Sequence, residues 1–174
     1  MLFAFLCVLP GIGQTPSATL AETTEWLQNN VGGMSCIAFS MGKTKAEAQQ
    51  HLEGFEATFA DCEMTLDTSV TIGSAGSMGS YRVHLGRLDP GRIAITPAVQ
   101  TPEGWFTLGE LPQAGIRLVT RNDEKLINAM TQPQTGPSNV STFRTAEINI
   151  PVRSGASVQP LVNAFSRAIA LCQP

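Results

Sequence analysis

The strongest hydrophobic pattern lies at the C-terminal end of the chain, between positions 158 and 172. Apolar residues recur there every three or four positions, which is the spacing of one face of an α-helix. These residues are Val158, Leu161, Val162, Phe165, Ala168, Ile169 and Cys172. Such a long apolar stripe must be buried against another layer, so we expect this helix to pack on a sheet.

A second helix is predicted near the beginning of the chain. Thr19 and Glu22 form a capping box, in which each side chain accepts a hydrogen bond from the backbone N–H of the other residue. The positions that share one face of the following helix are Leu20, Thr24, Leu27 and Val31. Gly32 and Gly33 come next and are a typical stop signal, so we expect the helix to end there.

The next segment contains a second capping box and then a change of period. Thr44 and Glu47 predict a weaker helix that ends near Gly54. From position 57 onward apolar and polar residues alternate, which predicts a half-buried strand. The residues on its apolar side are Ala60, Cys62, Met64 and Leu66.

Alternation and turn residues predict several more strands. In the clearest hairpin, residues 81–85 pair with residues 92–95 through a turn at Asp89-Pro90-Gly91. Two segments rich in glycine, serine or proline are interpreted as a flexible connection (72–80) and a long surface loop (132–142). Shorter strands are expected at 36–40, 105–108, 116–120 and 146–152.

These elements define an α+β fold class. We expect an antiparallel sheet or a small curled barrel, with an N-terminal helix and a packed C-terminal helix. The 174 residues are enough for one ordinary domain and too few for two comfortable ones. Charged residues make up only 14% of the chain, and 16 Gly and 11 Pro supply many turns. This composition favours a fold rich in strands and loops over a helical bundle.

The first residues of the chain have the features of a cleaved signal peptide. An apolar run at 2–9 is followed by the small residues Gly11 and Gly13 at the cleavage positions. The run is too short to span a bilayer, and we expect no transmembrane span in the mature chain. No Lys or Arg precedes position 43, so we also expect translation to start upstream of Met1. The expected organisation is a signal peptide at 1–13 and a single α+β domain at 14–174, exported to the periplasm or the extracellular space.

The balance of charge excludes one class of partner. The net charge is −3, and Lys and Arg residues form no cluster along the chain. Proteins that bind nucleic acids are usually basic and carry such clusters. We therefore expect no nucleic-acid partner.

Three segments of the chain carry a recognisable pattern. They are TLAETTEWL at 19–27, CEMTLD at 62–67 with LGRLDP at 85–90, and AFSRAIALC at 164–172. Together they resemble a group of uncharacterised exported bacterial domains that open with an LxETxxWL helix and close with an AFxHAIxLC helix. The resemblance implies a bacterial envelope setting and a shared fold, and it carries over no catalytic or binding residue. Where that group often has histidine in its last helix, this chain has Arg167.

The residue patterns that could carry chemistry are incomplete. Residues 75–79 fit the small-x-Ser-x-Gly outline of a nucleophile elbow, which would make Ser77 a nucleophile with His84 and Asp89 as partners. No apolar helix follows, so we expect a loop there rather than a catalytic serine. The two histidines, His51 and His84, lack the spacing of metal ligands. We expect neither a metal nor a cofactor.

These observations favour an exported, non-enzymatic domain that binds an envelope protein, a lipid or a small ligand. One alternative is a small hydrolase with a site around Ser77 and His84. Another alternative is a structural accessory subunit without a ligand.

Removal of the signal peptide leaves three cysteines, in a compartment that oxidises thiols. An odd count predicts one disulfide and one free thiol. Cys62 lies on the apolar side of its predicted strand and Cys172 ends the apolar stripe of the last helix, so packing of that helix on the sheet brings the two together. We predict a Cys62–Cys172 disulfide and an unpaired Cys36. The pair Cys36–Cys62, which closes a much shorter loop, and the absence of any bridge remain alternatives.

Overall fold

The structure, a computed structural model, contains two α-helices from opposite ends of the chain. Helix α1 spans Leu20–Val31 and helix α2 spans Val158–Leu171. The two helices pack against each other. The structure describes residues 18–31, 37–41, 49–72, 75–97, 105–107, 114–133, 139–152 and 157–174.

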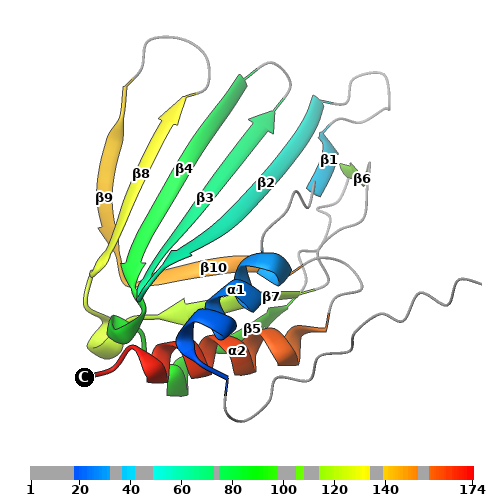
Figure 1. The fold of residues 1–174 in the computed structure, drawn as a ribbon. Helices are drawn as coiled ribbons and strands as arrows, with labels where there is room; N and C mark the ends of the chain where they lie inside the picture. Colours follow the sequence, from blue (N-terminus) through cyan, green and yellow to red (C-terminus); the bar gives the residue numbers. More distant parts are fainter. Residues whose placement is uncertain are drawn as a thin grey trace, which may run out of the picture.

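The described strands form two antiparallel sheets (Figure 1). The large sheet has seven strands in the order β6-β1-β2-β3-β4-β8-β9, and the small sheet has three in the order β10-β7-β5. The strands of the large sheet are β1 (Ile37–Met41), β2 (Gln49–Ala60), β3 (Glu63–Ile72), β4 (Ala75–His84), β6 (Trp105–Thr107), β8 (Ile127–Pro133) and β9 (Ser141–Thr145). The strands of the small sheet are β5 (Ala94–Pro97), β7 (Ala114–Val119) and β10 (Glu147–Val152).

Both helices and the small sheet gather at one end of the large sheet (Figure 1). Helix α1 contacts β2 on one side and α2 on the other, while α2 also contacts β5 and β7. The predicted α+β class, with a helix from each end of the chain, is therefore confirmed. In the described part of the chain the large sheet stays open between β6 and β9, so it is a sheet and not a closed barrel.

The hydrophobic core lies where the helices meet the two sheets. Its large, fully buried side chains come from all of these layers and include Leu27, Met64, Leu66, Ile116, Leu118, Ile150, Phe165 and Ile169. Burial of one such side chain contributes about 1.5–3 kcal/mol to folding, relative to its exposure. The apolar stripe of α2 supplies several of these residues, as its helical period predicts.

The predicted capping box of α1 is present. The backbone N–H of Thr19 donates to Glu22 Oε2 over 2.7 Å, and the backbone N–H of Glu22 donates to Thr19 Oγ1 over 3.3 Å. The face predicted to be buried carries Thr24, Leu27 and Val31, which are indeed buried. Both helix predictions at the ends of the domain are thus confirmed.

The predicted weak helix ending near Gly54 is wrong, because residues 49–60 form strand β2. From His51 to Ala60 this strand pairs with β3. Phe55 and Ala57 are buried and Glu56 is exposed, which is the period of a strand. Pairing with a long neighbour outweighs the local helix signal. The capping residues of that prediction, at 44–47, lie outside the described residues.

The single strand predicted from position 57 is two strands joined by a tight turn. The turn is at Asp61 and Cys62, between β2 and β3, and Asp61 adopts a positive φ of 51°. Aspartate tolerates this conformation better than most residues. As a result Ala60 is exposed while Met64 and Leu66 are buried, so the four residues assigned to one apolar side do not share it.

The segment interpreted as a flexible connection is mostly strand β4, which pairs with β3 from Ala75 to His84. Its glycines and serines give little strand signal because they offer no side chain to pack. Gly79 lies opposite Thr68, and a Cβ at Gly79 would stand only 2.6 Å from Thr68 Oγ1. The small residues therefore permit close packing at this point of the sheet.

The predicted hairpin between residues 81–85 and 92–95 is also wrong. Its first arm belongs to β4 in the large sheet, and its second arm belongs to β5, which pairs with β7 in the small sheet. Two short 3-10 turns, Leu85–Arg87 and Pro90–Arg92, lie between them. The turn chemistry itself is correct, since Asp89 Oδ1 accepts a hydrogen bond from the Gly91 N–H over 2.9 Å.

The predicted surface loop at 132–142 is shorter than expected, because both of its ends are strand. Strands β8 and β9 pair with each other, and residues 134–138 lie outside the described residues. The four shorter predicted strands correspond to β1, β6, β7 and β10, with Cys36 and Leu108 outside the described residues.

Candidate functional site

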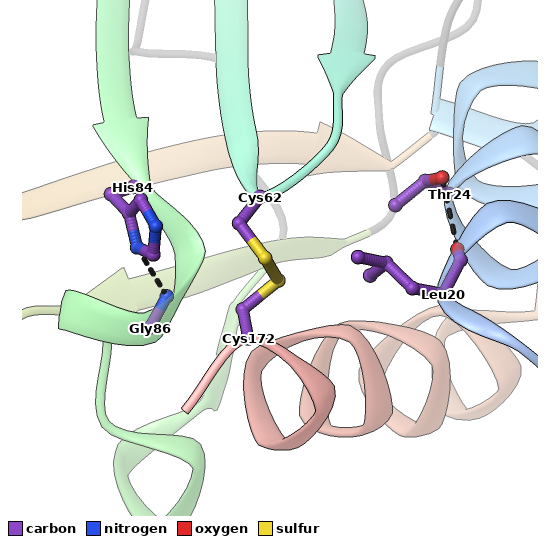
Figure 2. Close-up of a disulfide and its surroundings, with 6 residues drawn as sticks. All are labelled: Leu20, Thr24, Cys62, His84, Gly86 and Cys172. Carbon is purple, nitrogen blue, oxygen red and sulfur yellow. Dashed lines mark hydrogen bonds between the residues drawn. A yellow bond between two sulfur atoms is a disulfide. The ribbon is translucent and has the colours of Figure 1, made fainter. Parts of the chain in front are cut away.

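The structure joins Cys62 and Cys172 in a disulfide, the pair favoured by the sequence (Figure 2). Their Cα atoms are 5.6 Å apart, although 110 positions separate them in the chain. Cys62 stands in the β2–β3 turn and Cys172 directly follows α2. The bond therefore fastens the end of the last helix to a hairpin of the large sheet. Cys36 lies outside the described residues.

Ser77 and His84, proposed as partners in a hydrolase, do not meet. Both belong to β4, seven positions apart, which corresponds to about 23 Å along a strand. The odd separation also places their side chains on opposite faces of the sheet. The Asp89 carboxylate caps its own turn. His84 and Asp89 therefore form no acid–base pair with Ser77.

His84 instead fixes the turn that follows β4. Its Nδ1 accepts a hydrogen bond from the Gly86 backbone N–H over 3.2 Å (Figure 2). Next to it lies an open pocket of about 600 Å³ that Cys172 also lines. The charged residues around the pocket are Glu63, Arg87, Arg121 and Glu124. Because two acidic and two basic side chains share this pocket, its charge selects no single class of ligand.

The turn beside this pocket is held by an ion pair. Arg92 donates to Asp123 Oδ1 over 2.9 Å, and this hydrogen bond raises the pKa of Arg92. Asn122 and Asp123 both have positive φ, 56° and 55°. Asparagine and aspartate are the non-glycine residues that adopt this conformation most readily. The Arg92–Asp123 ion pair therefore has a structural role, which is to hold this turn.

A more selective arrangement lies on the exposed face of the large sheet. Arg82 on β4 pairs with Asn128 on β8, and Asn128 pairs with Arg144 on β9. Directly opposite residues in a sheet point to the same face, and all three side chains are exposed. Two strand spacings put the arginine backbones about 10 Å apart with the asparagine between them. We call these three residues the arginine row.

Among the described residues, no carboxylate pairs with the arginines of the row. Neither Arg82 nor Arg144 forms an ion pair with another residue of the described ranges. The row borders a shallow cavity of about 680 Å³ over β4, β8 and β9. Guanidinium groups bind carboxylates and phosphates through paired hydrogen bonds, and an amide NH₂ adds a further donor. The row therefore has the donors for an anionic group.

The acidic side chains of the described residues on this face lie on other strands. Glu56 on β2 and Asp67 on β3 stand directly opposite each other, and Glu63 stands opposite His84. Neither Asp67 nor Glu63 comes within 4 Å of the Arg82 guanidinium. The exposed face is thus divided into an acidic part on β2–β3 and a basic part on β4, β8 and β9.

No group of three or more histidine, cysteine or carboxylate side chains that could hold a metal occurs among the described residues. In the same part of the chain, neither helix is long and apolar enough to cross a membrane. The arginine row was not found by sequence reasoning, because its members are 46 and 16 positions apart and only strand pairing brings them together. The one sequence signal for it is the alternation of Arg82 with the apolar residues Tyr81 and Val83, which is the pattern of an outward-pointing side chain.

No protein-family model, no curated protein and no solved structure matches the chain.

Proposed function

We propose that this chain is an exported, non-enzymatic domain that binds a ligand with an anionic group, a carboxylate or a phosphate, at the arginine row. The observation that carries the proposal is the register that aligns Arg82, Asn128 and Arg144 on one exposed face. Hydrogen bonds to a charged group each contribute about 1.5–3 kcal/mol. Two arginines together are therefore sufficient for a weak but selective site.

Export is supported by two observations. The apolar run and small residues of positions 1–13 are typical of a signal peptide. A disulfide such as Cys62–Cys172 persists in oxidising compartments and is rare in the cytosol. The resemblance to exported bacterial domains agrees with both. Among the partner classes favoured by the sequence, an anionic lipid or small ligand fits the arginine row.

The proposal is tested by titrating the protein, recovered oxidised from its native compartment, with butyl phosphate in an isothermal titration calorimeter. The variant R82Q/R144Q is compared with R87Q/R121Q, which removes the same charge beside the disulfide. We expect the first variant to lose at least tenfold in affinity at low salt, because each tenfold needs only about 1.4 kcal/mol. The control should stay within twofold of the wild type.

Binding at the row should also weaken as salt is added, because exposed charges are screened over about 8–10 Å at moderate ionic strength. Equal losses in both double variants would place the anion elsewhere and contradict the proposal. The absence of butyl phosphate binding by the wild type at millimolar concentration would overturn it.

A further inference from the structure

Two exposed methionines continue the face of the sheet beyond the arginine row. Met130 follows Asn128 by two positions on β8, and Met78 lies on β4 opposite Gln132. Met130 is 40% exposed and Met78 is 47% exposed, so both stand open to solvent. The even separation places them on the same face as the row.

The register gives this patch a direction. Met130 lies about 6.6 Å from the arginine row along the strands, and Met78 lies about 13 Å from it. The direct neighbours of Met130 are Ser80 on β4 and Thr142 on β9, both small. From the cationic row, a strip over β4 and β8 therefore leads to the apolar side chains of Met130 and then Met78, with Gln132 opposite Met78.

A ligand that matches both ends of this strip has an anionic head and a hydrocarbon chain. We infer that the ligand of the proposed site is a single-chain anionic amphiphile, with its carboxylate or phosphate on the arginine row and its chain along Met130 and Met78. This inference rests on the proposed function and names its ligand class. The flexible thioether side chain of methionine adapts well to such a chain.

The same face argues against docking on an anionic membrane surface. Asp67 on β3 and Glu56 on β2 stand side by side, one and two strands from β4, and both are exposed. A flat membrane that touched the row would also approach these carboxylates, and like charges repel. The acidic strip therefore confines an anionic ligand to β4, β8 and β9, which suits a monomeric molecule.

The inference is tested by comparing decyl phosphate with butyl phosphate, both below the concentration at which micelles form, on the full oxidised protein. We expect decyl phosphate to bind the wild type at least tenfold more tightly than butyl phosphate. The variant M78Q/M130Q should lose most of this difference while keeping its affinity for butyl phosphate. The control I95Q/L171Q changes two other exposed apolar residues, which are 53% and 45% exposed, and should behave as the wild type.

The outcomes separate this inference from the proposed function. Equal affinities for the two phosphates would overturn the amphiphile and leave the anion site standing. A chain-length effect that M78Q/M130Q does not reduce would also overturn it, because the chain would then lie elsewhere. Co-sedimentation with phosphatidylglycerol vesicles, without binding of monomeric decyl phosphate, would replace the amphiphile by a membrane surface. If the wild type bound neither decyl phosphate nor butyl phosphate, the proposed function itself would be wrong.

Discussion

Arg167 on α2 donates hydrogen bonds to the backbone carbonyl oxygen of Ala18, the residue before the capping box of α1. Its Nε lies 2.8 Å from that oxygen, and one of its terminal nitrogens also bonds it. The contact joins positions 149 apart in the chain. It therefore fixes the beginning of the first helix against the last one, which gives Arg167 a structural role.

Replacement of Arg167 by methionine should destabilise the domain by about 1.5–3 kcal/mol, because the hydrogen bond to a charged donor is lost. Urea unfolding measures this change in the free energy of unfolding. Hydrogen exchange should also quicken at the first turn of α1. The control Arg121→Met removes an exposed arginine and should stay within about 0.5 kcal/mol of the wild type. Unchanged exchange in α1 would contradict the role assigned to Arg167.

The capping box predicts a pH dependence at Glu22. Hydrogen bonds from the Thr19 backbone and side chain hold the pKa of Glu22 below its ordinary value of 4.5, and Arg167 lowers it further. A lowered pKa means that the ionised carboxylate stabilises the folded state. This contribution is complete above pH 4.5 and disappears as the pH falls through the lowered pKa.

The difference in unfolding free energy between wild type and Glu22→Gln should therefore shrink on acidification below pH 4.5. In Thr19→Ala, NMR titration should show the pKa of Glu22 rising toward its ordinary value, and the lost cap should cost about 1 kcal/mol at neutral pH. Thr142→Ala, at an exposed position of strand β9 and outside any helix, is the control. A difference that stays constant between pH 7 and pH 3 would argue against the capping box.

The Cys62–Cys172 bond should be a large part of the stability of the domain. The loop that it closes spans 110 positions, for which the chain-entropy model gives about 4–5 kcal/mol. The variant C62S/C172S should show this loss in urea unfolding, and Cys36→Ser should not. Peptide mapping of the non-reduced protein should find Cys62 linked to Cys172, and Cys36 should be alkylatable. A linked peptide that contains Cys36 would show the assignment to be wrong.

Two glycines in neighbouring 3-10 turns offer a matched test of packing. A Cβ on Gly86 would run into the backbone carbonyl group of Cys172, whereas a Cβ on Gly91 would make only an ordinary contact of 3.4 Å with the Asp89 carboxylate. Gly86→Ala should therefore displace the end of α2 and destabilise the domain by about 1–3 kcal/mol. Gly91→Ala should cost much less. Equal melting temperatures for the two variants would mean that the end of α2 is not packed on this turn.

Local signals explain why both helices were predictable. The Thr19–Glu22 box and the apolar stripe of α2 depend only on residues three or four positions apart, so the sequence displays them directly. The Cys62–Cys172 pair was also predictable, because the apolar stripe of the last helix ends in Cys172 and must pack on the sheet. The predicted place of Cys62, on the apolar side of a strand, is wrong, because Cys62 lies in the turn between β2 and β3.

Strand pairing and the candidate site were decided by tertiary structure. Residues 72–80 lack large side chains, so their strand signal comes only from the neighbours that they pair with. The predicted turn at Asp89 is present. The two segments beside it join different sheets, because one pairs with β3 and the other pairs with β7. The arginine row needs the register of three strands at once, and a shift by one residue would turn Asn128 to the other face. Capping and helix periodicity are local and can be read from the chain, whereas a sheet face is made by residues that become neighbours only after folding.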